Sequence, residues 1–249
     1  MKINYKEPYW VKFKWEMESH HDNQYVTEFN KVENEICKTF QNLDEYTITI
    51  DFSVPEDYKT DEFSMIFGKP GKNMGLTYKK NEGTLAFEFW TKAKEDETDD
   101  KFHYCSFQML EPKEVEQGVI ISIIREKNKF NLYKNFVLSN SISFDSELID
   151  DYNESGLFIG CSNPGTYVPE HRYHGELEIK HLSILLNNSD FNVAKELYKT
   201  RPELLLEKTY YQDILCFYDF ATINNLEIVY DESMNANFLE KVPSLFIIP

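Results

Sequence analysis

The chain has 249 residues, 41% of them hydrophobic and 15% aromatic, which allows one large β-sandwich or two small domains and favours sheets over disorder. Its net charge of −17, with no cluster of lysine and arginine, argues against nucleic acid and anionic membrane surfaces as partners. No segment approaches the roughly 18 apolar residues that a membrane-spanning helix needs.

The N-terminal segment and the cysteines bear on the cellular compartment. "MKINYKEPYWVKFKW" contains no apolar signal-peptide core, so we expect a cytoplasmic location unless the chain is a fragment of a longer secreted protein. The four cysteines lie far apart and form no C-x-x-C pair, which is not the spacing of a metal site. We expect free and mostly buried thiols at Cys37, Cys105, Cys161 and Cys216.

Alternating hydrophobic residues predict strands in the first half of the chain. Residues 46–52 (YTITIDF) have the pattern of a half-buried strand, with Tyr46, Ile48, Ile50 and Phe52 on one face. A further strand is predicted at 63–67. Residues 74–80 and 84–90 predict a hairpin, and we expect Trp90 at its end to lie in the core.

The strand pattern continues after a charged loop at 92–101. The sheet resumes at 102–110. The nearly all-apolar segment 118–126 predicts a strand covered on both faces, followed after a turn of two or three residues by a strand within 128–135. Further strands are predicted at 155–160 and 174–185.

Helices are predicted near the C-terminal end. The segment 189–202 has Ser189 or Asp190 as N-cap, a helical body and Pro202 as a stop signal. Residues 203–211 favour a second short helix. Residues 27–40 fit a helix and a twisted edge strand about equally well.

The predicted fold class is therefore all-β. We expect one antiparallel β-sandwich of the jelly-roll kind over residues 1–249, with one or two short C-terminal helices. Residues 203–249 form either a C-terminal extension or closing strands of this domain.

Several segments resemble one known family. "EYTITIDFSVPE" (45–56), "VIISIIREKNKFNLYKNFVL" (119–138), "GLFIGCSN" (156–163) and "RYHGELEIKHLSIL" (172–185) resemble, in this order, motifs of laminin G-like domains in the concanavalin A-like lectin/glucanase superfamily. Residues 216–237 are similar to a segment that often opens these sandwiches. Here that segment would either return as a closing strand or begin an incomplete second unit.

Two departures from the family pattern have structural consequences. Leu177 and Ile179 share one face, whereas Leu182 and Ile184 follow in the opposite phase, so an extra residue near Lys180-His181 predicts a β-bulge. The family's Asn-Gly turn is replaced by Lys134-Asn135.

Two glutamates are candidate catalytic carboxylates of a glycoside hydrolase. Glu176 and Glu178 lie two residues apart on a predicted strand, with Cα atoms about 6.5 Å apart on one face. The glucanase branch of the resembled superfamily uses Glu-x-Asp-x-x-Glu on one strand, and the third acid is missing here. We find no other catalytic motif and predict that the chain is not an enzyme.

The loop between Cys161 and His174 is the candidate carbohydrate site. Sugar recognition requires an exposed aromatic plane and fixed polar groups for the hydroxyls. The loop offers both kinds of residue: Asn163, Tyr167, Glu170, His171, Arg172 and Tyr173. The alternative is that its tyrosines pack back onto the sandwich and its charged residues are solvated.

Calcium is an optional cofactor that the resemblance implies. Asp145, Asp150, Asp151 and Asn153 are candidate ligands, although their spacing matches no EF-hand loop. A solvated acidic loop is the alternative interpretation. We expect that no cofactor is required.

These observations favour a non-catalytic, lectin-like module whose partner is a glycan, within a larger protein or assembly. The resemblance also implies a second function, that of a protein-interaction or spacer domain in a toxin, an adhesin or a polysaccharide-assembly protein. A glycoside hydrolase is the third hypothesis. We expect neither a nucleic-acid partner nor a membrane span.

Overall fold

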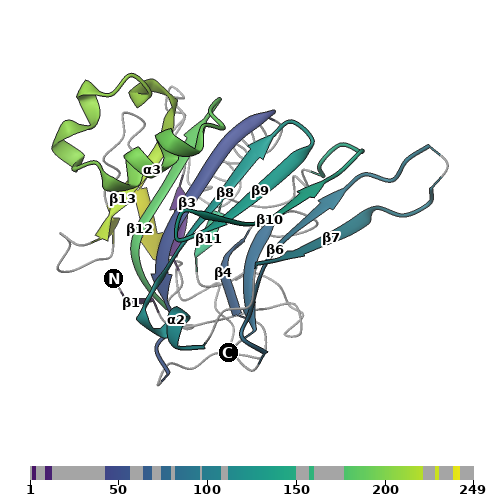
Figure 1. Ribbon diagram of the computed structural model, residues 1–249, viewed down its shortest axis with the longest axis horizontal. Coiled ribbons are helices and arrows are strands. Elements are labelled where there is room, and N and C mark those ends of the chain that lie inside the picture. Colours follow the sequence, from purple (N-terminus) through teal and green to yellow (C-terminus); the bar gives the residue numbers. More distant parts are fainter. Residues whose placement is uncertain are drawn as a thin grey trace, which may run out of the picture.

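The alternating segments pair into two antiparallel sheets, seen in the computed structural model of Figure 1. The structure describes residues 2–3, 9–12, 43–56, 64–68, 74–79, 82–95, 97–107, 112–149, 157–159, 177–220, 228–229 and 238–241. The predicted all-β class is confirmed. The segments 27–40 and 69–73 lie outside the described residues.

The first sheet contains the longest strands. In spatial order its strands are β1 (Lys2–Ile3), β12 (Leu177–Leu186), β3 (Glu45–Ser53), β8 (Val119–Glu126), β9 (Lys129–Lys134) and β10 (Val137–Ser143), and β13 (Ile214–Asp219) also pairs with β12. The segment after residue 203 therefore supplies a strand of this sheet. The short helix α2 (Pro112–Gln117) precedes β8.

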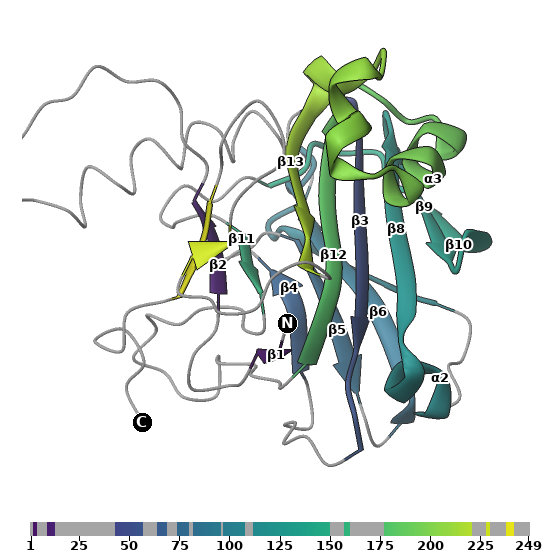
Figure 2. The same ribbon diagram turned by 90° about the vertical axis from the view of Figure 1, so that its left-hand side faces the viewer.

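The second sheet lies behind the first one in Figure 1 and on its left side in Figure 2. Its strands in spatial order are β14 (Ile228–Val229), β15 (Phe238–Lys241), β2 (Tyr9–Lys12), β11 (Leu157–Ile159), β4 (Ser64–Gly68), β5 (Gly75–Lys79), β6 (Thr84–Thr91) and β7 (Lys101–Ser106). The predicted hairpin is formed by β5 and β6. The charged segment 92–100 joins β6 to β7.

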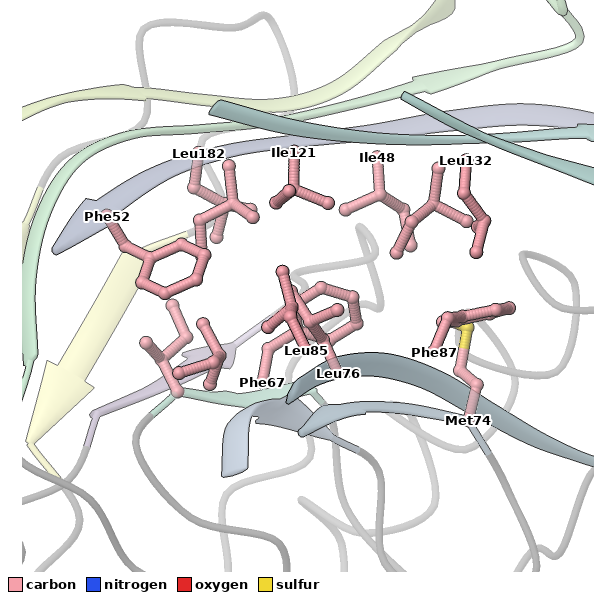
Figure 3. Packing of buried hydrophobic residues seen from close by; sticks show 14 of the residues in the cluster. Ile48, Phe52, Phe67, Met74, Leu76, Leu85, Phe87, Ile121, Leu132 and Leu182 are labelled. Atoms are coloured by element: carbon pink, nitrogen blue, oxygen red, sulfur yellow. The ribbon is translucent and has the colours of Figure 1, made fainter. Parts of the chain in front are cut away.

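The hydrophobic core fills the space between the two sheets. In Figure 3, Ile48, Ile121 and Leu182 of the first sheet point toward Phe67 and Leu85 of the second. These five side chains are at most 1% exposed. Burial of this apolar surface is the main force that holds the layers together.

Strand β3 differs from the half-buried strand that its alternation predicts. Thr47, Thr49 and Asp51, on the face away from the core, are 2%, 1% and 7% exposed. Helix α3 (Phe191–Lys199) covers them, as it contacts β3 and β12. The outer face of β3 is thus buried beneath α3 (Figure 2).

The predicted helix has the expected start. Asp190 is the N-cap, and its Oδ1 accepts a hydrogen bond of 2.8 Å from the backbone N–H of Asn192. The second short helix of the sequence prediction is not an α-helix. Two 3-10 segments, Pro202–Glu207 and Tyr211–Asp213, occupy this region and complete a small hydrophobic cluster around Leu185, Leu197 and Phe217.

Both departures from the family motif appear as local irregularities. The register of β12 against β3 shifts between Ile179 and His181, which confirms the predicted bulge. Strands β9 and β10 are joined by Asn135 and Phe136, whose φ angles are 50° and 62°. Positive φ at both positions is the geometry of a type I′ turn, where glycine is normally preferred.

Candidate functional site

The loop that the sequence indicated as the carbohydrate site lies outside the described residues. This applies to all six of its candidates: Asn163, Tyr167, Glu170, His171, Arg172 and Tyr173. The described strands β11 and β12 flank the loop on its two sides. Its role remains a prediction.

A different set of polar and aromatic residues lies on the outer face of the second sheet. The register pairs Glu88 with Tyr104 and Trp90 with Phe102. These four side chains point away from the core because Phe87 and Phe89, which alternate with them, point into it. We call this group, together with Thr77 of the adjacent strand, the β6–β7 patch.

The aromatic half of the β6–β7 patch is partly open to solvent. The rings of Trp90 and Phe102 lie with centroids 5.1 Å apart and planes inclined by 50°. Phe102 is 45% exposed and Tyr104 is 43% exposed, whereas Trp90 is half-buried. Two neighbouring ring surfaces on a rigid strand are therefore accessible to a ligand.

The position of Trp90 corrects the sequence prediction. Trp90 was expected in the core, but its parity on β6 is that of Glu88, opposite to the core residues Leu85, Phe87 and Phe89. The alternation within 84–91 already contained this signal.

The polar half of the β6–β7 patch is a fixed carboxylate. Thr77 donates a hydrogen bond of 2.7 Å from Oγ1 to Oε1 of Glu88. Burial raises the pKa of the Glu88 carboxyl, while the Thr77 hydrogen bond and the charge of Lys79 act in the opposite direction. Burial and the charge of Glu88 also raise the pKa of the Tyr104 hydroxyl.

The predicted acid pair does not form a described site. Glu176 lies outside the described residues, and Glu178 is half-buried on β12, opposite Ser53 of β3. Along the outer faces of β5, β6 and β7, which are described throughout, Glu88 is the single carboxylate. Acid–base hydrolysis of a glycoside needs two carboxyl groups, so these three strands do not supply that chemistry.

A serine–histidine pair on β12 has the contact of a nucleophile and its base. Nε2 of His181 lies 2.8 Å from Oγ of Ser183. The two residues are only 5% and 2% exposed. Burial lowers the pKa of His181 from 6.5 to about 3, so the imidazole is neutral and weakly basic. Since α3 covers this pair, we assign it to the structure of the layer and not to catalysis.

The described residues also bear on the metal and membrane predictions. Within them, no group of three or more His, Cys, Asp and Glu residues could hold a metal ion. Asp145 forms an ion pair with Lys94, and the other calcium candidates, Asp150, Asp151 and Asn153, lie outside the described residues. None of the described helices is long and apolar enough to cross a membrane. Two cysteines are described, Cys105 and Cys216, and both are buried free thiols.

Comparison with known proteins gives likeness of structure and not of sequence. No family profile and no curated protein sequence matches the chain. A solved Bacteroides ovatus protein to which carbohydrate binding is ascribed matches 96% of this chain with a TM-score of 0.56 and 11% identity. Our chain spans only 58% of that protein. The likeness is one of fold.

Two weaker likenesses involve binding domains. The receptor-binding domain of botulinum neurotoxin type G matches 64% of this chain and 38% of its own, with 11% identity and a TM-score of 0.41. The CBM40 domain of the Ruminococcus gnavus IT-sialidase, solved with α2,3-sialyllactose, matches 57% of this chain and 78% of its own, with 13% identity and a TM-score of 0.38. All three are solved structures with less than 15% identity to this chain.

Proposed function

We propose that this chain is a non-catalytic carbohydrate-binding module that holds a sugar against the β6–β7 patch. The observation that carries the proposal is the juxtaposition of the exposed rings of Phe102 and Tyr104 with the fixed carboxylate of Glu88. Aromatic faces pack against the C–H face of a pyranose ring, while a carboxylate accepts hydrogen bonds from its hydroxyls. Both groups are held on strands, which keeps their spacing fixed.

Two further observations support this proposal. The Bacteroides ovatus protein, whose fold is similar, has carbohydrate binding ascribed to it. The resemblance of four segments to laminin G-like domains of the concanavalin A-like superfamily agrees with a lectin-like role. The loop residues Asn163, Tyr167, Glu170, His171, Arg172 and Tyr173 stay a second predicted contact region for the glycan. Calcium stays an optional cofactor.

A glycan array tests the proposal with three variants of matched design. Phe102→Ala and Tyr104→Ala remove the exposed rings. We expect each variant to weaken glycan binding about tenfold, because stacking of a ligand on one aromatic ring contributes about 1–2 kcal/mol. Leu206→Ala is the control, since Leu206 is a 72% exposed apolar residue on a 3-10 segment. Absence of any bound glycan, or equal binding by all variants, contradicts the proposal.

The same array separates the β6–β7 patch from the loop. Tyr167→Ala and Tyr173→Ala test the predicted loop contacts. If these variants lose binding while Phe102→Ala binds normally, the sugar occupies the loop and not the sheet face.

The alternative function is a protein-interaction domain, and one surface favours it. Strand β10 is the last described strand at its edge of the first sheet, and it carries Val137 and Leu138, which are 68% and 53% exposed. The residues of β10, VLSNSIS, include no charge, although exposed edges usually carry one to prevent pairing with another chain. Loss of a partner protein upon Leu138→Lys, without any glycan binding, would favour this alternative.

A further inference from the structure

We propose that the β6–β7 patch selects sugars that carry a protonated amino group. This inference rests on the proposed function and names the class of ligand. It follows from the position of an incompletely satisfied carboxylate beside accessible aromatic rings. A site of this composition attracts a cation more strongly than a neutral or an acidic group.

The carboxylate of Glu88 is the first component. One oxygen, Oε1, accepts the 2.7 Å hydrogen bond from Thr77. The other oxygen, Oε2, has no hydrogen bond or ion pair with any residue in the described part of the chain. The side chain is half-buried, and burial of an ionised carboxylate is unfavourable unless its oxygens are paired. An ammonium group of a ligand would donate a hydrogen bond to Oε2 and add a positive charge beside the carboxylate.

The rings of Phe102 and Tyr104 are the second component. A cation over the face of an aromatic ring is attracted by the negative charge of the ring face, and the effect grows when the cation is partly desolvated. Tyr104 lies directly opposite Glu88 on the neighbouring strand, and Phe102 is the next residue on that face of β7. One amino sugar can therefore place its ammonium near Glu88 and its apolar ring face on an aromatic ring.

The charge around the patch is the third component. The charge of Lys79 acts on the Glu88 carboxyl, but the Lys79 Nζ also forms a 3.3 Å ion pair with Glu82. The whole chain has a net charge of −17. The electrostatic field of this negative charge raises the local concentration of cations and repels uronic and sialic acids. The negative carboxylate of Glu88 would also repel the carboxylate of an acidic sugar directly.

A matched series of oligosaccharides tests the inference by titration calorimetry. The β-1,4-linked tetramers of glucosamine, N-acetylglucosamine and glucose share one backbone and differ only in the substituent at C2. At a pH at which the amine is protonated, we expect the glucosamine tetramer to bind about tenfold more tightly than the glucose tetramer. A glucose tetramer that binds equally well or more tightly overturns the inference.

Two variants identify the origin of the preference. Glu88→Gln keeps the shape of the side chain and removes the charge, so we expect it to abolish the tenfold preference for the glucosamine tetramer over the glucose tetramer. Glu207→Gln removes one charge from the exposed end of a 3-10 segment instead. Unspecific attraction to the acidic chain predicts the same small change for both variants and is screened by salt.

The outcomes separate this inference from the proposed function. If neutral sugars bind with sensitivity to Phe102→Ala and Tyr104→Ala but no amine preference is found, the module is a lectin and the inference is wrong. If the glucosamine tetramer does not bind at all, the inference is wrong as well, and the glycan array decides the proposed function independently. A preference that survives Glu88→Gln also contradicts the assigned site.

Discussion

The hydroxyl of Tyr198 donates a hydrogen bond of 2.6 Å to Oδ2 of Asp51 and so connects helix α3 to strand β3. Asp51 is only 7% exposed, and burial raises the pKa of its carboxyl, while the Tyr198 hydrogen bond and the charge of Lys180 lower it. Burial, followed by the same contact with Asp51, raises the pKa of the Tyr198 hydroxyl. Removal of the hydroxyl would leave a buried carboxylate oxygen without its donor.

We therefore expect Tyr198→Phe to lower the free energy of unfolding by about 1–3 kcal/mol at neutral pH. Chemical denaturation followed by fluorescence measures the change. Tyr211→Phe is the control, since it removes a hydroxyl from a half-buried tyrosine in another segment. If Asp51→Asn abolishes the effect of Tyr198→Phe in a double-mutant cycle, the loss comes from this contact. Equal stability of the Tyr198→Phe and parent chains would show that α3 does not depend on it.

Fold stability should fall in acid because of His181. Burial lowers the pKa of this side chain from 6.5 to about 3. Below pH 6.5 the unfolded chain binds a proton that the folded chain does not bind, so stability declines as the pH falls toward about 3. The decline from this single group reaches at most about 1.4 kcal/mol per pH unit.

Urea titrations between pH 7 and pH 4 measure this effect by comparison with His181→Gln. Gln keeps a hydrogen-bonding group near Ser183 but does not titrate. We expect the variant to be less stable at pH 7, because the ring contacts with Tyr198 and Phe217 are lost, and the difference to shrink or reverse toward pH 4. A difference that stays constant over this range would mean that His181 is not buried in solution.

The sequence predicted the strands well because their signal is local. Alternation marked β3 and the β5–β6 hairpin, a nearly all-apolar run marked β8, and a change of phase between Ile179 and Leu182 located the bulge. Each of these features is set by the side chains of one or two neighbouring segments. The N-cap at Asp190 is likewise set by residues close to it in the sequence.

The remaining features depend on contacts between distant segments. Asp51 and Tyr198 are 147 residues apart, so the alternation of β3 could not show that its outer face is covered. The β6–β7 patch requires the register of two strands separated by a charged loop, which the sequence alone does not specify. The predicted loop site at Asn163–Tyr173 stays a prediction, because those residues lie outside the described part of the chain.

The β9–β10 turn offers a test of backbone strain. Phe136 has a φ of 62°, and its ring packs against Tyr198 with centroids 5.3 Å apart. Phe136→Gly and Phe136→Ala both remove the ring, but alanine keeps a Cβ that disfavours positive φ. We expect the alanine variant to be less stable than the glycine variant by about 1 kcal/mol in thermal or chemical unfolding.

The parent residue in this turn provides the comparison. If Phe136→Gly is less stable than the parent chain, the aromatic packing on α3 outweighs the relief of the left-handed conformation. If the glycine and alanine variants are equally stable, the turn adopts another conformation in solution. Asn135 is left unchanged in these variants because its Oδ1 accepts a 2.9 Å hydrogen bond from the backbone N–H of Ile120.

Glu88 should destabilise the free protein, as expected of a residue kept for binding. Its carboxyl has a raised pKa in the folded chain, so ionisation opposes folding at neutral pH. We expect Glu88→Gln to increase the free energy of unfolding at pH 7, with the gain disappearing as the pH falls through the raised pKa toward the ordinary value of 4.5. Denaturant titrations at pH 7 and pH 4.5 check this sign. A loss of stability at pH 7 would mean that the charge of Glu88 is satisfied by the protein itself, and the need for a cationic ligand would disappear.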